Sequence, residues 1–285
     1  MARYLGVAGI QYEVEPGQDN SELMLDKLAL CQKLFPWIDL ICFSELSVCG
    51  LDESFAQPIP NSFTKRVCKW AAETQKWIIP GSMYEKEGAK IYNTALVISP
   101  SGQIVAKYRK LFPWVPVETS VPGDGFCVFE IPGKGRIGLC ICYDQWFPEV
   151  IRTLSWMGAV AIFNPTATTT SDRPLEKILA QAHAITNQLY YFSINGVGAG
   201  GNGQSIFVDP EGRVLQVSGE REIIMTEVID LDMVSRVREY GTLGLSQVWK
   251  NFAYSGIKFP VYGEGFNSGE IFKSLGEFQK HEKIE

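Results

Sequence analysis

One segment of the chain recurs in its second half, and this internal repeat constrains the fold more than any other feature. Residues 95–105 read Ala-Leu-Val-Ile-Ser-Pro-Ser-Gly-Gln-Ile-Val, and residues 205–215 read Ser-Ile-Phe-Val-Asp-Pro-Glu-Gly-Arg-Val-Leu. In both, a Pro-x-Gly turn containing Gly102 or Gly212 separates two apolar, β-branched runs, which predicts a β-hairpin. The chain therefore reads as two similar halves.

The order of the predicted elements supports the repeat. In the first half we expect strands at 5–11, 39–44 and 77–82, helices at 21–35 and 61–76, and a hairpin at 93–109. In the second half we expect strands at 136–142, 159–163 and 190–195, helices at 148–157 and 173–188, and a hairpin at 203–218. Both halves thus follow one plan, and continuous apolar strands of this kind need cover on both faces.

This plan predicts the fold class. Two halves that each leave one sheet face open can bury those faces against each other. We therefore expect an α/β fold, a four-layer α-β-β-α sandwich that forms a single domain over residues 1–250. A single doubly wound sheet is the alternative. Residues 251–285, with aromatics among Gly and Pro and then a charged run, read as a C-terminal extension or arm that packs on a neighbouring subunit of a homo-oligomer.

Composition excludes several classes of partner. A net charge of -6 and the lack of a dense Lys/Arg tract argue against a nucleic-acid surface. The apolar run at 5–10 is too short for a signal sequence, and no run approaches the roughly 18 residues of a membrane span. We expect a cytoplasmic protein that acts on a small molecule, without a nucleic-acid or membrane partner.

The cysteines and histidines narrow the chemistry. Seven cysteines without framework spacing predict reduced thiols, mostly buried. There is no C-x-x-C pair, and the two histidines, His183 and His281, are far apart, so we expect no metal site and no cofactor. With so few histidines, a general base here should be a carboxylate or a lysine.

Three reactive side chains follow predicted strands. Glu45 follows the apolar strand at 39–44, Lys110 follows the first hairpin, and Cys142 ends the strand at 136–142. Taken singly they read as a capping carboxylate, a surface charge and a core thiol. Because ligand sites in open α/β sheets gather at strand ends, the three together predict one site.

The residues around them resemble a known family. Phe-Ser-Glu45-Leu, Tyr-Arg-Lys110 and Cys142-Tyr-Asp-x-x-Phe-Pro-Glu resemble, in this order, motifs of the nitrilase superfamily of carbon–nitrogen hydrolases, and the likeness extends to about residue 215. It implies the α-β-β-α sandwich, with Cys142 as nucleophile, Glu45 as general base and Lys110 as stabiliser of the tetrahedral intermediate. The stretch from Lys110 to Glu118 resembles the amidase version, in which the second glutamate assists.

The chemistry of these residue types agrees with the resemblance. A thiol with a pKa of about 8.5 needs a base, which Glu45 can supply, while the Lys110 ammonium favours the thiolate. The Lys110 ammonium and the backbone N–H of Tyr143 can stabilise an oxyanion. The aromatic side chains of Trp114, Tyr143 and Trp146 suggest a partly apolar substrate pocket. We expect a small primary amide to be cleaved, with an N-carbamoyl amine or a nitrile as the alternative substrate.

Other interpretations compete with this one. Residues 196–201 match G-x-G-x-x-G, but they lead into a hairpin and not into the helix that a dinucleotide site requires. His183 could instead serve as the base for Cys142. An acyltransferase, or a relative that binds amides without catalysis, is the alternative of another class.

Overall fold

Two large β-sheets form the centre of the molecule. The computed structural model describes residues 2–15, 17–115, 117–263 and 269–270. The larger sheet has the strand order β15 (Ile223–Asp230), β1 (Tyr4–Gln11), β3 (Leu40–Phe43), β4 (Trp77–Ile79), β6 (Lys90–Ile98) and β5 (Ser82–Glu87), and β7 (Ile104–Arg109) also pairs with β6. The other has the order β14 (Val214–Val217), β13 (Ile206–Val208), β11 (Tyr190–Asn195), β10 (Ala159–Thr166), β9 (Gly135–Leu139) and β8 (Cys127–Ile131). The short strands β2 (Glu13–Val14) and β12 (Val197–Gly198) pair separately.

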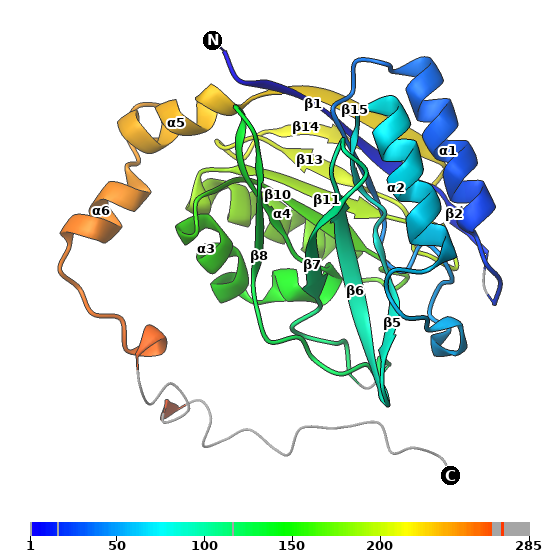
Figure 1. Ribbon diagram of the computed structural model, residues 1–285. Helices are drawn as coiled ribbons and strands as arrows, with labels where there is room; N and C mark the ends of the chain where they lie inside the picture. Colours follow the sequence, from blue (N-terminus) through cyan, green and yellow to red (C-terminus); the bar gives the residue numbers. More distant parts are fainter. Residues whose placement is uncertain (1, 16, 116, 264–268, 271–285) are drawn as a thin grey trace.

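Helices cover both outer faces of this pair of sheets. The α-helices are α1 (Ser21–Leu34), α2 (Ser62–Thr74), α3 (Pro148–Trp156), α4 (Arg173–Asn187), α5 (Leu231–Tyr240) and α6 (Val248–Tyr254). Three 3₁₀ turns complete the described elements: η1 (Glu53–Phe55), η2 (Cys142–Trp146) and η3 (Pro260–Tyr262). In Figure 1, α1 and α2 lie on one side of the sheets and α3 lies on the other.

The buried side chains show the four layers directly. One apolar cluster joins the two sheets and includes Val7 and Val97 of the larger sheet and Phe163 and Phe192 of the other. A second cluster packs α1 and α2 on the larger sheet, and a third packs α3 and α4 on the other. The predicted α-β-β-α sandwich is therefore confirmed.

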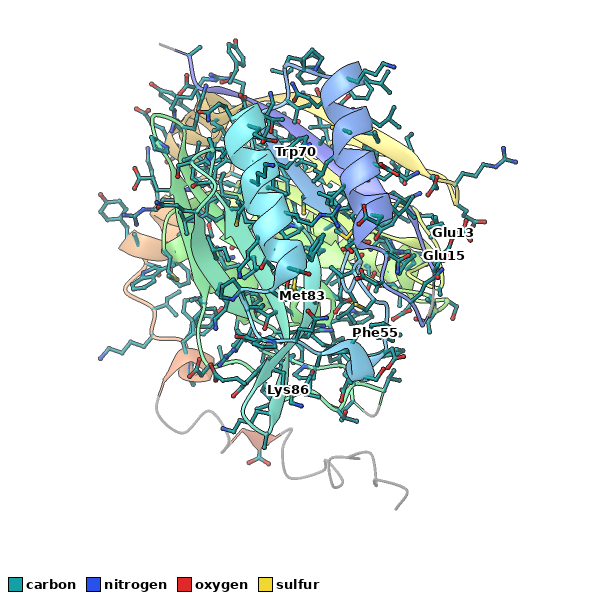
Figure 2. All side chains as sticks on the ribbon, turned by 45° about the vertical axis from the view of Figure 1, so that its right-hand side comes forward. Glu13, Glu15, Phe55, Trp70, Met83 and Lys86 are labelled. Atoms are coloured by element: carbon teal, nitrogen blue, oxygen red, sulfur yellow. The ribbon has the colours of Figure 1, made fainter. Side chains whose placement is uncertain are left out.

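The helices over the larger sheet follow from local sequence signals. Met24, Leu28 and Cys31 recur on one face of α1 and are buried. Before α2, the Asn61 side chain accepts a hydrogen bond from the Thr64 N–H at 2.9 Å, which closes a capping box. Figure 2 shows α1 and α2 side by side over the sheet, with Trp70 on α2.

Strand pairing confirms the internal repeat. In the first half β1, β3 and β4 are parallel neighbours and β6 joins antiparallel to β4. In the second half β9, β10 and β11 are parallel neighbours and β13 joins antiparallel to β11. Each half also gains an antiparallel strand on its first strand, β15 on β1 and β8 on β9.

Several elements differ from the sequence-based expectation. The strands β5, β8 and β15 and the helix α5 were not predicted, and the strand expected at 136–142 ends at Leu139. The residues of β15 alternate irregularly between buried and exposed positions, so a period-two pattern is absent from the sequence. Such strands are defined by their partners in the sheet and not by local preference.

The C-terminal segment begins against the chain's own helices. The boundary expected at residue 250 falls within α6. The Trp249 indole donates a hydrogen bond to the Asn187 carbonyl at 3.0 Å, and the Arg152 guanidinium lies 4.9 Å from the centre of the Trp249 ring. Most of the predicted arm, residues 264–268 and 271–285, lies outside the described residues. Packing of this arm on a neighbouring subunit stays a prediction.

Within the described part of the chain, no helix has the length and apolar composition that crossing a membrane requires.

Gly81 is expected to be critical for the loop that carries Glu45. Its φ is +70°, and a Cβ atom there would lie 1.8 Å from the Ser44 carbonyl oxygen. Gly88 has a similar φ of +61° but open space around it. In urea unfolding, Gly88→Ala should cost about 1–2 kcal/mol, the usual penalty for a left-handed alanine, and Gly81→Ala clearly more. Equal losses would contradict this account.

Candidate active site

A fully buried ammonium group forms the centre of the candidate site. Lys110 directly follows β7, and its Nζ lies 2.8 Å from Glu45 Oε1 and 2.5 Å from Glu118 Oε1. The Asn93 side-chain amide donates a second hydrogen bond, of 2.8 Å, to Glu45 Oε1. All four side chains are buried. The structure thus brings together three of the four residues predicted for catalysis.

The charges in this array act strongly on one another. Burial by itself lowers the pKa of Lys110, but the anionic groups around it, Glu45 first among them, outweigh burial and raise that pKa well above its usual value. Burial, together with repulsion from Glu45, raises the pKa of Glu118 to about 7, and the Lys110 ammonium limits this rise. Lys110 therefore stays protonated, while Glu118 can change its charge near neutral pH.

Backbone contacts hold the two carboxylates in place. Glu45 lies two residues beyond β3, and its N–H donates to the carbonyl of Thr166, the last residue of β10, at 3.1 Å. The N–H of Glu118 donates to the Trp114 carbonyl at 2.9 Å, which closes a turn after Lys110. Glu45 thus lies at the junction of the two sheets.

Cys142 occupies a strained turn and not the end of a strand. It is the first residue of η2 and has a φ of +45°, a left-handed conformation that a side chain disfavours. The prediction that it ends the strand at 136–142 is therefore wrong in detail. Its Sγ lies 3.9 Å from the Thr168 hydroxyl. Burial and then repulsion by Glu45 raise the pKa of the Cys142 thiol well above its usual value, while Lys110 lowers it.

Asp144 connects the cysteine turn to the strand that carries Lys110. Its Oδ2 accepts hydrogen bonds from the Tyr108 hydroxyl at 2.6 Å and from the Ile141 N–H at 2.9 Å, and its Oδ1 accepts one from the Phe112 N–H at 2.9 Å. Burial raises the pKa of Asp144 to about 6. Because Tyr108 belongs to β7, this carboxylate fixes the position of the Cys142 turn relative to Lys110.

His183 supports the same turn from α4. Its Nε2 lies 2.6 Å from the Gln145 carbonyl oxygen, which requires the ring to donate its proton there. Burial, with a contribution from the charge of Arg152, lowers the pKa of His183. The ring is therefore neutral and directed at the backbone of η2, which does not favour His183 as the base for Cys142.

A pocket opens onto these groups. Its wall includes Glu45, Glu118 and Cys142, together with the three aromatic residues predicted to contact substrate, Trp114, Tyr143 and Trp146. Leu51, Ala167, Thr168, Thr169, Thr170, Asp172 and Glu176 complete the lining. The predicted site residues therefore share one cavity or, for Lys110, lie directly behind it.

Sequence reasoning missed the residues contributed by the β10–α4 connection. Glu176 is buried and bonded through Oε2 to the Thr168 hydroxyl and to Arg173, both at 2.8 Å. The i, i+3 spacing of Arg173 and Glu176 at a helix start and the run of three threonines were visible signals. Asn93, within β6, carried no local signal, because only strand pairing brings it to Glu45.

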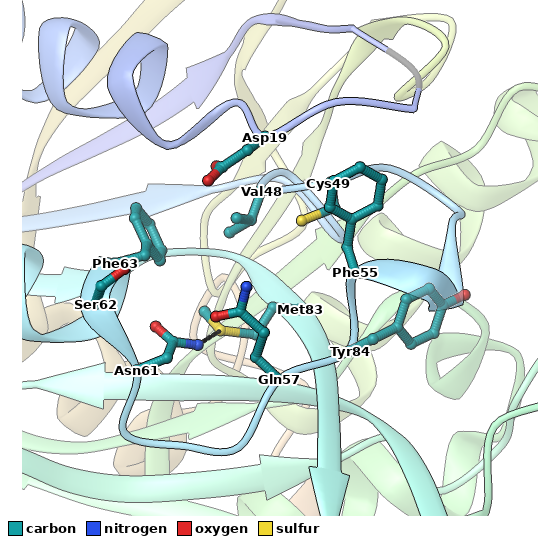
Figure 3. A pocket seen from close by; sticks show the side chains of 10 residues that line it. All are labelled: Asp19, Val48, Cys49, Phe55, Gln57, Asn61, Ser62, Phe63, Met83 and Tyr84. Carbon is teal, nitrogen blue, oxygen red and sulfur yellow. Dashed lines mark hydrogen bonds between the residues drawn. The ribbon is translucent and has the colours of Figure 1, made fainter.

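A second pocket lies beside the loop after Glu45 (Figure 3). Asn61, Met83 and Tyr84 are part of its wall, and the Asn61 amide contacts Met83 Sδ at 4.0 Å. Burial and then the charges of Glu118 and Glu45 raise the pKa of Tyr84, so this wall lies near the array of Glu45, Lys110 and Glu118. None of the predicted site residues lines this pocket.

In the described part of the chain, no group of three or more His, Cys, Asp or Glu side chains is placed to hold a metal ion.

Sequence comparison finds relatives among formamidases. A formamidase of Bacillus thuringiensis (strain Al Hakam) is 33% identical over 175 residues, which are 59% of this chain and 53% of that protein. A formamidase of Bacillus cereus (strain AH820) matches to the same extent. The chain thus spans about half the length of the curated relatives that it matches.

Solved structures share the fold. A carbon–nitrogen hydrolase of Helicobacter pylori G27 superposes with a TM-score of 0.75 at 24% identity, covering 92% of this chain and 97% of that one. An amidase from Nesterenkonia sp. superposes with a TM-score of 0.73 at 24% identity, covering 84% and 94%. The sequence pattern of the family described as carbon–nitrogen hydrolase matches residues 7–239. This chain belongs to the carbon–nitrogen hydrolase family, the nitrilase superfamily that its motifs resemble.

Proposed function

We propose that this protein hydrolyses a small primary amide to a carboxylate and ammonia through a thioester on Cys142. The observation that carries this proposal is the cavity that Cys142, Glu45 and Glu118 line together, with the Lys110 ammonium bound to both carboxylates behind its wall. A thiol and carboxylates in one cavity, with an ammonium held against them, are the groups that nucleophilic cleavage of an amide needs.

The first step joins sulfur to the amide carbon. The pKa of the Cys142 thiol is raised, chiefly by burial, so the resting thiol keeps its proton and needs a base at the moment of attack. Glu45 takes that proton as the S–C bond forms and the carbonyl electrons move onto oxygen. The Lys110 ammonium and the Tyr143 backbone N–H stabilise the oxyanion, and one such donor lowers a barrier by roughly 3–4 kcal/mol.

The second step returns the enzyme to its starting state. Glu45 passes its proton to the nitrogen, the C–N bond breaks, and ammonia leaves a thioester. Glu45 then takes a proton from water as the water oxygen attacks the thioester carbon. The S–C bond breaks, Glu45 returns its proton to the sulfur, and the product acid leaves and ionises to the carboxylate.

Glu118 is suited to orient the amide. Its Oε1 accepts from Lys110, whereas its Oε2 is buried without a hydrogen-bond partner. A buried acceptor that lacks a donor carries a free-energy penalty. A ligand N–H that donates to this oxygen removes the penalty, which favours binding. The NH₂ group of a primary amide supplies such a donor.

The relatives support this choice of reaction. The curated relatives are named formamidases. The Nesterenkonia amidase has been solved with butyramide bound, and also with acrylamide added to its active-site cysteine. Ammonia release from this chain on amides, ureido compounds and nitriles would separate the amide substrate from the alternatives, and added amine acceptors would reveal acyl transfer.

We also propose a cytoplasmic homo-oligomer in which residues 1–250 form the catalytic domain and residues 251–285 form an extension. All seven cysteines are free thiols, as expected in a reducing compartment. Leu175, Ile178 and Ile185 of α4 expose apolar side chains that a second subunit could cover.

Replacing the nucleophile should abolish turnover without unfolding the protein. Cys142→Ala removes the only sulfur that the described residues contribute to the pocket wall, so ammonia release should fall to the uncatalysed level while circular dichroism is unchanged. Cys140→Ala, two residues away and fully buried, is the matched control and should retain turnover. Intact-mass spectrometry of the wild-type enzyme should detect an acyl group on Cys142. Wild-type rates in Cys142→Ala would refute the mechanism.

Activity should fall in acid because Glu118 gains a proton. Since its pKa is raised to about 7, mainly by burial, the carboxylate is lost progressively below that pH, and kcat/KM should fall with it. Glu118→Gln should lower kcat/KM at all pH values. It should also remove the acid limb of the pH profile, which is the decrease of kcat/KM below about pH 7. Glu220→Gln, an exposed change of the same charge, should leave the profile unaltered. An unchanged limb in Glu118→Gln would assign it to another group.

His183 should prove to be a positioning residue. Glutamine can still donate an N–H toward the Gln145 carbonyl, so His183→Gln should lower kcat/KM less than about tenfold. Removal of a general base typically costs about 10²–10⁴-fold. A loss of that size, without a change in melting temperature, would restore His183 as the base.

A further inference from the structure

The pocket around Cys142 carries more negative charge than amide cleavage uses. Four carboxylates contribute to its wall, those of Glu45, Glu118, Asp172 and Glu176. No Lys, Arg or His side chain does so among the residues that the structure describes. The Lys110 ammonium lies behind the wall, where Glu45 and Glu118 bind it. The mechanism leaves Asp172 and Glu176 without a role.

Glu176 presents a free acceptor close to the nucleophile. It is 2% exposed, and its Oε2 accepts both from Arg173 and from the Thr168 hydroxyl, at 2.8 Å each. Its Oε1 makes no hydrogen bond within the described residues. The same Thr168 hydroxyl lies 3.9 Å from Cys142 Sγ, so one side chain bridges the carboxylate and the sulfur. A ligand held by Cys142 can therefore reach Glu176 through a short chain of atoms.

The Arg173 guanidinium cannot serve a ligand at this position. It is fully buried, and it also donates to the Ser193 hydroxyl at 3.0 Å and to the Gln204 carbonyl at 3.0 Å. Arg173 thus balances the charge of Glu176 through Oε2, and Oε1 of Glu176 remains available as an acceptor. The pocket therefore offers two carboxylate oxygens that bind no other protein group among the described residues: Glu118 Oε2, which is buried and suits the amide nitrogen, and Glu176 Oε1, which suits a second donor.

The rest of the wall suits a cation. Asp172, at the start of α4, is partly exposed and accepts a hydrogen bond from the Thr170 hydroxyl. Trp114, Tyr143 and Trp146 add aromatic rings, whose faces attract ammonium groups. A negatively charged substrate would meet repulsion from this wall, and an alkyl group would leave the Glu176 acceptor without a donor.

We propose that Glu176 and Asp172 form an ammonium-binding subsite, so that the preferred substrates are small primary amides whose short acyl chain carries a protonated amine. This inference rests on the proposed amidase function and specifies its substrate class. In this arrangement Glu118 binds the amide NH₂ group and Cys142 attacks the amide carbon. Glu176 and Asp172 bind the ammonium at the other end of the substrate.

Three amides of similar size test the subsite. In 4-aminobutanamide the chain ends in an ammonium, in pentanamide a methyl group replaces that ammonium, and in succinamate a carboxylate replaces the whole terminal aminomethyl group. Wild-type kcat/KM should favour the cation over the methyl compound by at least about tenfold, as expected for hydrogen bonds to charged groups. Succinamate should be the poorest substrate, and added salt should reduce the preference for the cation.

Variants then assign the effect to the proposed residues. Asp172→Asn and Glu176→Gln should each lower kcat/KM for 4-aminobutanamide several-fold more than for pentanamide. Glu220→Gln changes the net charge equally on an exposed site and should leave that ratio unchanged. Glu176→Gln leaves the buried Arg173 without its counter-ion, so if it fails to fold, Asp172→Asn and Glu176→Asp carry the test.

The outcomes separate the two proposals. If pentanamide is cleaved as well as 4-aminobutanamide, the amidase function stands and the ammonium subsite is refuted. If no amide releases ammonia, the proposed function fails. Calorimetry of the Cys142→Ala protein then measures the subsite alone, and it should bind 4-aminobutanamide at least about tenfold more tightly than pentanamide. Equal binding of both compounds would overturn the inference.

Discussion

The arrangement of this molecule depends on one buried charge, the ammonium of Lys110. Removing an ammonium from water is costly, and the cost is offset only where anionic groups meet it in good geometry. Here Glu45 and Glu118 both lie within hydrogen-bond distance of Nζ. The strand β7, which ends just before Lys110, the loop after β3 and the turn that carries Glu118 must therefore all keep their places.

The two halves of the repeat share a scaffold and differ in their chemistry. The ends of β3 and β7 in the first half supply Glu45 and Lys110, whereas the second half supplies Cys142 from the turn after β9. Asp144 joins these contributions, because it binds the backbone of the cysteine turn and the Tyr108 hydroxyl of β7. A symmetric pair of sheets thus holds a site that has no symmetry of its own.

Burial of the site also determines its resting state. The pKa of the Cys142 thiol is raised, first by burial and then by the charge of Glu45, so the proposed nucleophile is neutral at rest. A neutral thiol reacts slowly with unwanted electrophiles, since the thiolate is the nucleophile. The same loss of solvation leaves Glu118 Oε2 as a buried acceptor that a bound molecule can use.

The sequence by itself determined the scaffold and the principal reactive groups. Repeated hairpins and apolar strands predicted two halves and a four-layer sandwich, because period and turn chemistry are local properties. Glu45, Lys110 and Cys142 could be predicted as site residues because each lies at or just beyond the end of an expected strand and in a recognisable motif. The strands β8 and β15 escaped prediction, since their pairing partners and not their own residues define them.

Only the tertiary structure decided the contacts between residues far apart in the chain. It brought Asn93 into hydrogen-bond contact with Glu45 and Tyr108 into hydrogen-bond contact with Asp144. It also linked Glu176 to Cys142 through the Thr168 hydroxyl and gave Cys142 a left-handed backbone conformation beyond its strand. The physical reason is that hydrogen bonds and pKa shifts depend on distance and burial in three dimensions, which local sequence does not encode. The chain therefore displays its reactive groups in its sequence, but the charge of the pocket, and with it the substrate class that we propose, follows from packing.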